Sequence, residues 1–113
     1  MQNAVDKILN EFVNGTYDIL GDRVKKIILY GSYARGDYSN ESDIDIMILT
    51  DLSDGEIVEY RTILSDFAFD LEWDSDFKIM FSPIIKNIDK FNYWVDTMPF
   101  YINIQNEGVV LHG

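Results

Sequence analysis

One stretch constrains the fold more than any other part of the chain: residues 24–50, with the sequence VKKIILYGSYARGDYSNESDIDIMILT. It begins with an apolar run rich in β-branched residues that continues to Tyr30 and breaks at Gly31. After a polar loop, Asp43 and Asp45 lead into a second apolar run. This order predicts a strand, a glycine turn that opens a short helical turn, a loop and a second strand.

The two aspartates stand at period two, so both side chains leave the same face of the second strand, about 6–7 Å apart along the backbone. The isoleucines between and after Asp43 and Asp45 then point into the core. Two neighbouring carboxylates repel each other and gain nothing from burial unless a cation lies between them. A Mg²⁺ ion, which takes one or two carboxylates together with phosphate oxygens, fits this pair. Gly31 lets the backbone approach a polyphosphate, and Ser32 offers an N–H and a hydroxyl at a helix start.

These residues carry a family resemblance. Gly31-Ser32, followed after ten residues by Asp43-x-Asp45, resembles the signature of the nucleotidyltransferase superfamily that includes DNA polymerase β and the kanamycin nucleotidyltransferases. The strings GSYARGDYSNESDIDIMI and PFYINIQNEGVVLHG are similar to its minimal bacterial branch, the MNT proteins, which includes antitoxins of HEPN-domain toxins. The resemblance implies an α/β domain with the polymerase β-like nucleotidyltransferase fold, in which helices pack on one face of a small mixed β-sheet.

The resemblance also implies an activity: transfer of AMP from ATP to a hydroxyl, with tyrosine as the expected acceptor, of a partner HEPN toxin. Asp43 and Asp45 would hold Mg²⁺, and Gly31 and Ser32 would bind the nucleotide. Arg35 has two interpretations, a structural pairing with Asp37 or with a carboxylate of the site, and a contact with the nucleotide phosphates. Two other functions stay open, a catalytically degenerate antitoxin that only covers its toxin and an antibiotic-type small-molecule nucleotidyltransferase.

The remaining elements follow from periodicity and turn signals. The apolar spacing predicts a helix over about 3–14 that Gly15 ends. A capping box, Ser53 with Glu56, opens a second helix, and alternation predicts a third strand over 77–81. Further helices are expected from about Asn87 and from Pro99, with a closing strand at 109–111.

The third carboxylate of the superfamily is not evident. It usually lies on the strand after the second helix, on the face of the Asp pair. On a strand over 77–81 that face would carry Lys78 and Met80, which are not acidic. We therefore assign Asp76 as the third catalytic carboxylate, with Asp74 still earlier on the chain. Three outcomes stay open: Asp76 substitutes, catalysis proceeds slowly without it, or the protein binds without catalysing.

Composition narrows the function classes. A length of 113 residues predicts one domain, 1–113, with a globular core. No apolar run is long enough for a membrane span, the N-terminus does not resemble a signal peptide, and the chain has no cysteine, so we expect a cytoplasmic protein. The net charge of −11 argues against direct nucleic-acid binding. Such an acidic surface suits a basic protein partner, or serves only solubility.

Overall fold

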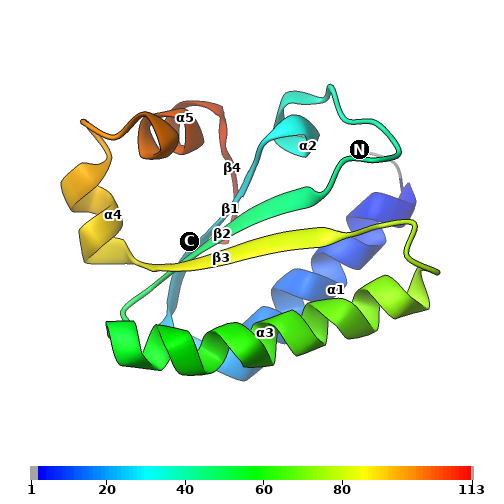
Figure 1. Cartoon of the computed structure of the whole chain (residues 1–113), viewed down its shortest axis with the longest axis horizontal. Coiled ribbons are helices and arrows are strands. Elements are labelled where there is room, and N and C mark those ends of the chain that lie inside the picture. The colour runs from blue at the N-terminus through cyan, green and yellow to red at the C-terminus, as the bar shows by residue number, and fades with distance from the viewer. Residues whose placement is uncertain (1–2, 113) are drawn as a thin grey trace.

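The protein is built around a four-stranded mixed sheet (Figure 1). The computed structural model describes residues 3–112. The strands, in the order β3-β2-β1-β4 across the sheet, are β1 (Val24–Tyr30), β2 (Ile44–Thr50), β3 (Phe81–Asn87) and β4 (Val109–His112). Strand β1 is antiparallel to β2 and β4, whereas β2 and β3 are parallel and joined by a helix. This arrangement confirms the predicted α/β class with a small mixed sheet.

Two long helices, α1 (Asn3–Leu20) and α3 (Asp54–Asp74), cover one face of the sheet (Figure 1). The other face is covered in part by α4 (Ile88–Trp94) and α5 (Pro99–Glu107), which the prediction had placed with the other helices. The reason is that β1 and β2 are apolar on both faces, as central strands are when both sides are buried. On this second face Phe91 and Ile104 pack against Ile28, Met47 and Leu49.

The first helix is longer than predicted. Gly15 lies inside α1, which continues to Leu20, and does not end it. The glycine is needed for packing, because a Cβ at this position would lie 2.0 Å from the Phe67 ring of α3. That ring in turn stacks on Phe12, with the centroids 5.9 Å apart. The chain then turns at Gly21, with φ of 59°, into a 3₁₀ turn over Gly21–Arg23.

The bounds predicted for the third strand, 77–81, are wrong. Strand β3 begins only at Phe81, because the backbone of Asp76 and Phe77 is left-handed, with φ of 56° and 58°, and interrupts the extended conformation. The start of β3 is set by the buried Glu72 of α3, whose Oε2 accepts the Phe81 N–H at 2.8 Å. Pro83 lies inside β3, which is tolerated because β3 is an edge strand.

Several other predicted elements are confirmed. They are the strand at 24–30, the helical turn α2 (Ser32–Arg35) stopped by Gly36, the capping box of Ser53 and Glu56, the helices that follow Asn87 and begin at Pro99, and the closing strand. No helix within residues 3–112 combines the length and the apolar character needed to cross a bilayer.

The packing of Gly15 against Phe67 gives a test of the fold. A Gly→Ala change in an open helix interior normally stabilises, but we expect Gly15→Ala to destabilise by about 1–3 kcal/mol because its Cβ overpacks the ring. Gly55→Ala is the matched control, since its Cβ meets no atom within 4 Å. That variant should be neutral or stabilised by up to about 1 kcal/mol. Urea unfolding of both variants checks the prediction, and equal effects would contradict it.

Candidate active site

The two aspartates of the motif lie at the start of β2. Asp43 is the last residue before the strand and is exposed, whereas Asp45 is its second residue and is half-buried. The isoleucine between them is fully buried, as predicted from the period-two spacing. The N–H of Ile44 donates to the Met80 carbonyl at 2.8 Å, which fixes the start of β2 beside the segment that leads into β3.

The carboxyl of Asp45 is affected by burial and by the charges around it. Burial raises the pKa of Asp45, and the negative charge of Asp43 raises it further. The positive charge of Arg35 opposes this shift without cancelling it. Within residues 3–112, neither aspartate takes part in an ion pair. The site therefore holds two like charges whose repulsion a bound cation would relieve.

Gly31 connects β1 to this pair. Tyr30, the last residue of β1, is the sheet neighbour of Asp45, and Gly31 then turns the chain with φ of 72°. A Cβ on Gly31 would lie 2.2 Å from Oδ2 of Asp45, so only glycine fits between the turn and the carboxylate. The predicted proximity of the glycine turn to the Asp pair is thus present in the structure.

Helix α2 starts directly after Gly31. Its first backbone bonds run from the N–H groups of Ala34 and Arg35 to the Gly31 carbonyl, both at 3.1 Å. The N–H groups of Ser32 and Tyr33 precede these bonds, as the first donors of a helical turn do. The turn ends at Gly36, where φ is 84°. Ser32 is thus held at the start of a turn that begins beside Asp45.

Arg35 forms two ion pairs. Its Nε lies 3.3 Å from Oδ2 of Asp37, which confirms the predicted pairing within the loop. Its Nη1 lies 3.4 Å from Oε2 of Glu107, at the end of α5. Glu107 was not predicted, because its partner is 72 residues away along the chain and no local pattern joins them. Contact of Arg35 with phosphates stays a prediction.

A small pocket of about 180 Å³ opens next to Gly31 and Arg35, with its other wall on α5. Its aromatic lining consists of Tyr30 and Phe100, whose rings meet edge to face with centroids 5.8 Å apart. Burial, and then the charge of Asp45, raises the pKa of Tyr30 to about 12. Tyr30 therefore stays neutral at physiological pH beside the acidic pair.

The loop between α2 and β2 is held by two stacked rings. Tyr33 of α2 is buried and lies parallel to Tyr38 of the loop, with the centroids 4.2 Å apart and the planes at 6°. Burial raises the pKa of Tyr33, as do Tyr38 and the charge of Asp43. The stack thus holds the loop close to the exposed member of the Asp pair.

The β3 residue beside Asp45 carries a hydroxyl and not a carboxylate. In the parallel pairing of β2 and β3, Asp45 is opposite Ser82, so both side chains lie on the same face. Asp76 precedes β3 in the left-handed connection and is exposed, so it does not have the strand position assigned to it. Within residues 3–112, no three acidic, histidine or cysteine side chains come together as a metal-binding group. Asp76 therefore does not join Asp43 and Asp45.

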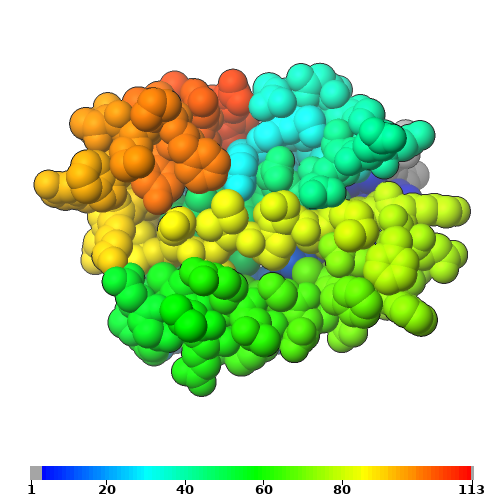
Figure 2. Space-filling model, in the orientation of Figure 1, coloured from blue at the N-terminus to red at the C-terminus, as the bar shows by residue number. Residues whose placement is uncertain are grey.

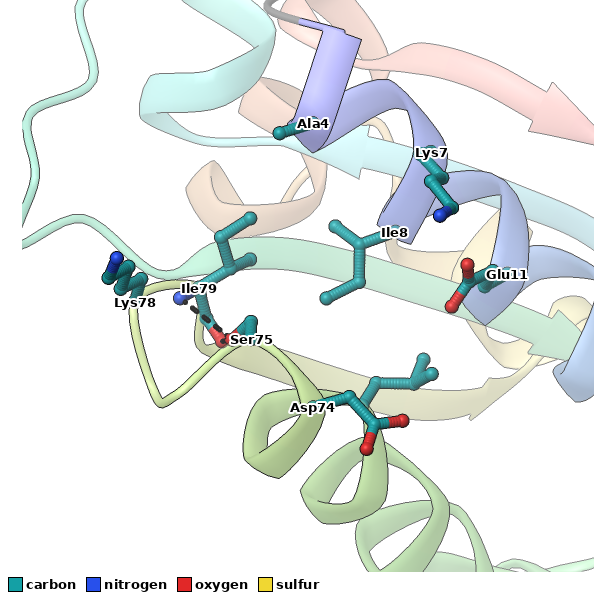
Figure 3. A pocket seen from close by; sticks show the side chains of 9 residues that line it. Ala4, Lys7, Ile8, Glu11, Asp74, Ser75, Lys78 and Ile79 are labelled. Atoms are coloured by element: carbon teal, nitrogen blue, oxygen red, sulfur yellow. Dashed lines mark hydrogen bonds between the residues drawn. The ribbon is translucent and has the colours of Figure 1, made fainter.

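Asp74 lies elsewhere as well. It lines a pocket of about 330 Å³ between the start of α1 and the end of α3 (Figure 3). Ile8 and Ile79 face one another across this pocket, and Ser75 Oγ accepts the Ile79 N–H at 3.3 Å. None of the lining residues belongs to the glycine turn or to the Asp pair. This pocket is separate from the candidate active site.

The donor set of the site fits a hard divalent cation. Asp43 and Asp45 supply carboxylate oxygens from adjacent same-face positions, and Ser82 adds a neighbouring hydroxyl. A Mg²⁺ ion is usually bound by one or two carboxylates and takes its other ligands from phosphate and water. The two carboxylates of this site lie beside the start of a helical turn, which is the kind of place where phosphates bind, so the residues present fit these requirements.

Comparison with known proteins agrees with this geometry. Residues 7–110 match the family described as nucleotidyltransferase domain. A protein from Methanocaldococcus jannaschii, named as a candidate protein adenylyltransferase, is 36% identical over 107 residues, covering 95% of this chain and 97% of that protein. A second protein of that organism, with the same type of name, is 38% identical over 79 residues, covering 70% of this chain and 76% of that protein.

The repulsion within the pair predicts how stability depends on pH. Because the pKa of Asp45 is raised above 3.8, its ionisation disfavours the folded state at neutral pH. We expect Asp45→Asn to raise the melting temperature at pH 7 in metal-free buffer. The free energy of unfolding should rise by no more than about 1 kcal/mol, since solvent screens the pair. The advantage should disappear as the pH falls through the raised pKa toward 3.8.

Asp18→Asn, at an exposed position of α1, is the control and should change the melting temperature little at either pH. A marked loss of metal-free stability in Asp45→Asn would show that the carboxylate has a structural role.

Proposed function

Since the chain belongs to the nucleotidyltransferase domain family, we propose that it transfers AMP from ATP to a hydroxyl group of a partner protein. The observation that carries this proposal is the close approach of Asp45 to the turn at Gly31, which places the acidic pair beside a glycine turn that opens a helix. The names of the two archaeal relatives support a protein as the acceptor.

In the proposed mechanism, Asp43 and Asp45 would hold Mg²⁺, which would neutralise charge on the triphosphate. The N–H and hydroxyl of Ser32 bind the distal phosphates at the start of α2. The acceptor oxygen forms a bond to the α-phosphorus while the bond from that phosphorus to the bridging oxygen breaks. Pyrophosphate leaves with the electron pair, and the hydroxyl proton passes to solvent. The residues of the chain act by positioning and by charge stabilisation.

The hydroxyl at Ser82 favours tyrosine as the acceptor. A carboxylate at this position would serve as the base for the attacking hydroxyl, but Ser82 cannot do so at neutral pH. A phenol, with a pKa of about 10, ionises far more readily than an aliphatic hydroxyl and needs less help from a base. A tyrosine side chain is therefore the acceptor that this site would serve best.

The size of the pocket argues for a macromolecular acceptor. The pocket beside Gly31 measures about 180 Å³, whereas pockets that enclose small molecules typically measure about 300–1,000 Å³. This disfavours the antibiotic-type small-molecule alternative. A partner protein would bring its own acceptor side chain, and the net charge of −11 would steer a basic partner to the site.

We further propose that the partner is a HEPN-domain toxin and that this protein is its antitoxin, as the resemblance to the MNT proteins implies. A second candidate function is neutralisation by covering the toxin without catalysis. The observation that favours it is Ser82, which leaves the site with two carboxylates. Under both functions the partner binds to this chain, and they differ in whether its mass changes.

The decisive experiment incubates the protein and Mg-ATP with the product of the neighbouring gene, for which we expect a HEPN domain. Intact mass should show the gain of one AMP unit on the partner and its loss on mutation of the acceptor tyrosine to phenylalanine. Asp43→Ala and Asp45→Ala should lower the transfer rate by at least about a hundredfold, because each removes charge stabilisation of the transition state.

Asp76→Asn is the matched control, because Asp76 precedes β3 and, within residues 3–112, belongs to no group of three metal-binding side chains; it should transfer AMP at the wild-type rate. If Asp43→Ala binds the partner and still neutralises its toxicity without a mass gain, covering is the function. If the wild-type protein leaves the partner's mass unchanged with every nucleoside triphosphate, the enzymatic proposal is wrong.

A further inference from the structure

Three aromatic side chains form an exposed cluster at the end of α3. Phe69, Trp73 and Phe77 are 50%, 64% and 44% exposed. Their ring centroids lie 6.3 Å apart for Phe69 and Trp73, 5.6 Å for Phe69 and Phe77, and 5.7 Å for Trp73 and Phe77. The rings contact one another and remain open to solvent, and we call them the α3 aromatic cluster. Clustered exposed aromatic rings mark interaction surfaces more often than isolated ones do.

One ring of the cluster, that of Phe77, belongs to a residue with a strained backbone. Phe77 has φ of 58°, in the left-handed region that bulky residues avoid, and the preceding Asp76 has φ of 56°. This conformation is fixed by the Phe77 N–H, which donates to the Glu72 carbonyl at 2.8 Å. It leaves the Phe77 ring beside Trp73 on the outside of the molecule. Strain at an exposed aromatic residue is typical of positions kept for recognition.

Acidic side chains border the cluster. Asp66, Asp70 and Asp74 follow one another at four-residue spacing along α3, next to the stripe of Phe69 and Trp73. Within residues 3–112, none of these three aspartates forms an ion pair. A ligand for this surface therefore needs apolar groups for the rings and positive charges for the border. Lysine and arginine also bind favourably over aromatic faces.

The segment that follows the cluster leads to the start of β2. Three residues after Phe77 lies the exposed Met80. Its carbonyl accepts the N–H of Ile44, the residue next to Asp43. Figure 2 shows the end of α3 and the segment after it, in yellow-green, at one end of the molecule. A partner seated on the cluster would thus extend toward the start of β2.

We propose that the α3 aromatic cluster docks the partner protein through an amphipathic segment in which lysine or arginine residues accompany apolar ones. This rests on the proposed function, because it names where a protein acceptor is held. The docking surface supplies affinity that the small pocket beside Gly31 does not. A second copy of the chain is disfavoured as the occupant, since two chains of charge −11 repel each other at these acidic borders.

The first test uses a fluorescein-labelled amphipathic helix of leucine and lysine, with a leucine–glutamate helix of the same pattern as the comparison. Anisotropy should show binding of the lysine peptide only, weakened by added salt. Trp73→Ser/Phe77→Gly should weaken it by about tenfold or more. Tyr93→Ser, which removes a ring that is 74% exposed on α4, is the matched control and should bind as the wild type does.

A second pair of variants tests the charges without touching the rings. Asp66→Asn/Asp70→Asn should weaken binding of the lysine peptide and reduce its salt dependence. Asp18→Asn/Asp22→Asn makes the same change of charge at exposed positions elsewhere and should have less effect. The double variant Trp73→Ser/Phe77→Gly should melt within about 4 °C of the wild type, because glycine relieves the left-handed strain.

Equal affinity of the wild type and both cluster variants for the lysine peptide would overturn the proposal. So would sedimentation showing a wild-type dimer that Trp73→Ser/Phe77→Gly converts to a monomer, since the occupant would then be a second copy. Asp43→Ala should bind the peptide as the wild type does, which separates docking from chemistry. In the transfer assay the cluster variant should raise the KM for the protein acceptor and leave kcat unchanged.

Discussion

The candidate site depends on the close approach of Asp45 to Gly31. Their contact joins the end of β1 to the start of β2, so the antiparallel ladder between these strands holds the turn and the carboxylate together. A side chain at position 31 would meet Oδ2 of Asp45 at 2.2 Å, and the φ of 72° that starts α2 favours glycine for a second reason. The position of Ser32, and with it the proposed phosphate site, therefore follows from the pairing of two buried strands.

Elements with local causes could be predicted from the sequence, and those with tertiary causes could not. The strand 24–30 and the capping box of Ser53 and Glu56 depend on neighbouring residues, and both are confirmed. Gly15 resembles a helix terminator until its contact with Phe67 is known. The alternation over 77–81 is a local strand pattern, but the side chain of Glu72 accepts the N–H of Phe81, nine residues later, and β3 begins there.

The same division applies to the site. Asp43, Asp45 and the turn at Gly31 lie within one short stretch whose spacing predicts that they meet, and the structure brings them together. Ser82 and Glu107 enter through the register of β3 and the packing of α5, which no pattern within the motif specifies. Asp76 was assigned from a strand start at 77, whereas β3 begins at Phe81, and its register places Ser82 beside Asp45.

The missing carboxylate and the exposed aromatic cluster have one structural cause. The backbone at Asp76 and Phe77, between α3 and β3, is left-handed. This conformation keeps Asp76 out of β3 and leaves the Phe77 ring beside Trp73 in solvent. A chain extended through these residues would place an acidic side chain nearer the strand and would remove the ring from the cluster. The same few residues thus leave Ser82 beside Asp45 and build an apolar surface with an acidic border. Such a site is less complete by itself and better suited to a partner that brings both a readily ionised acceptor and a basic docking segment.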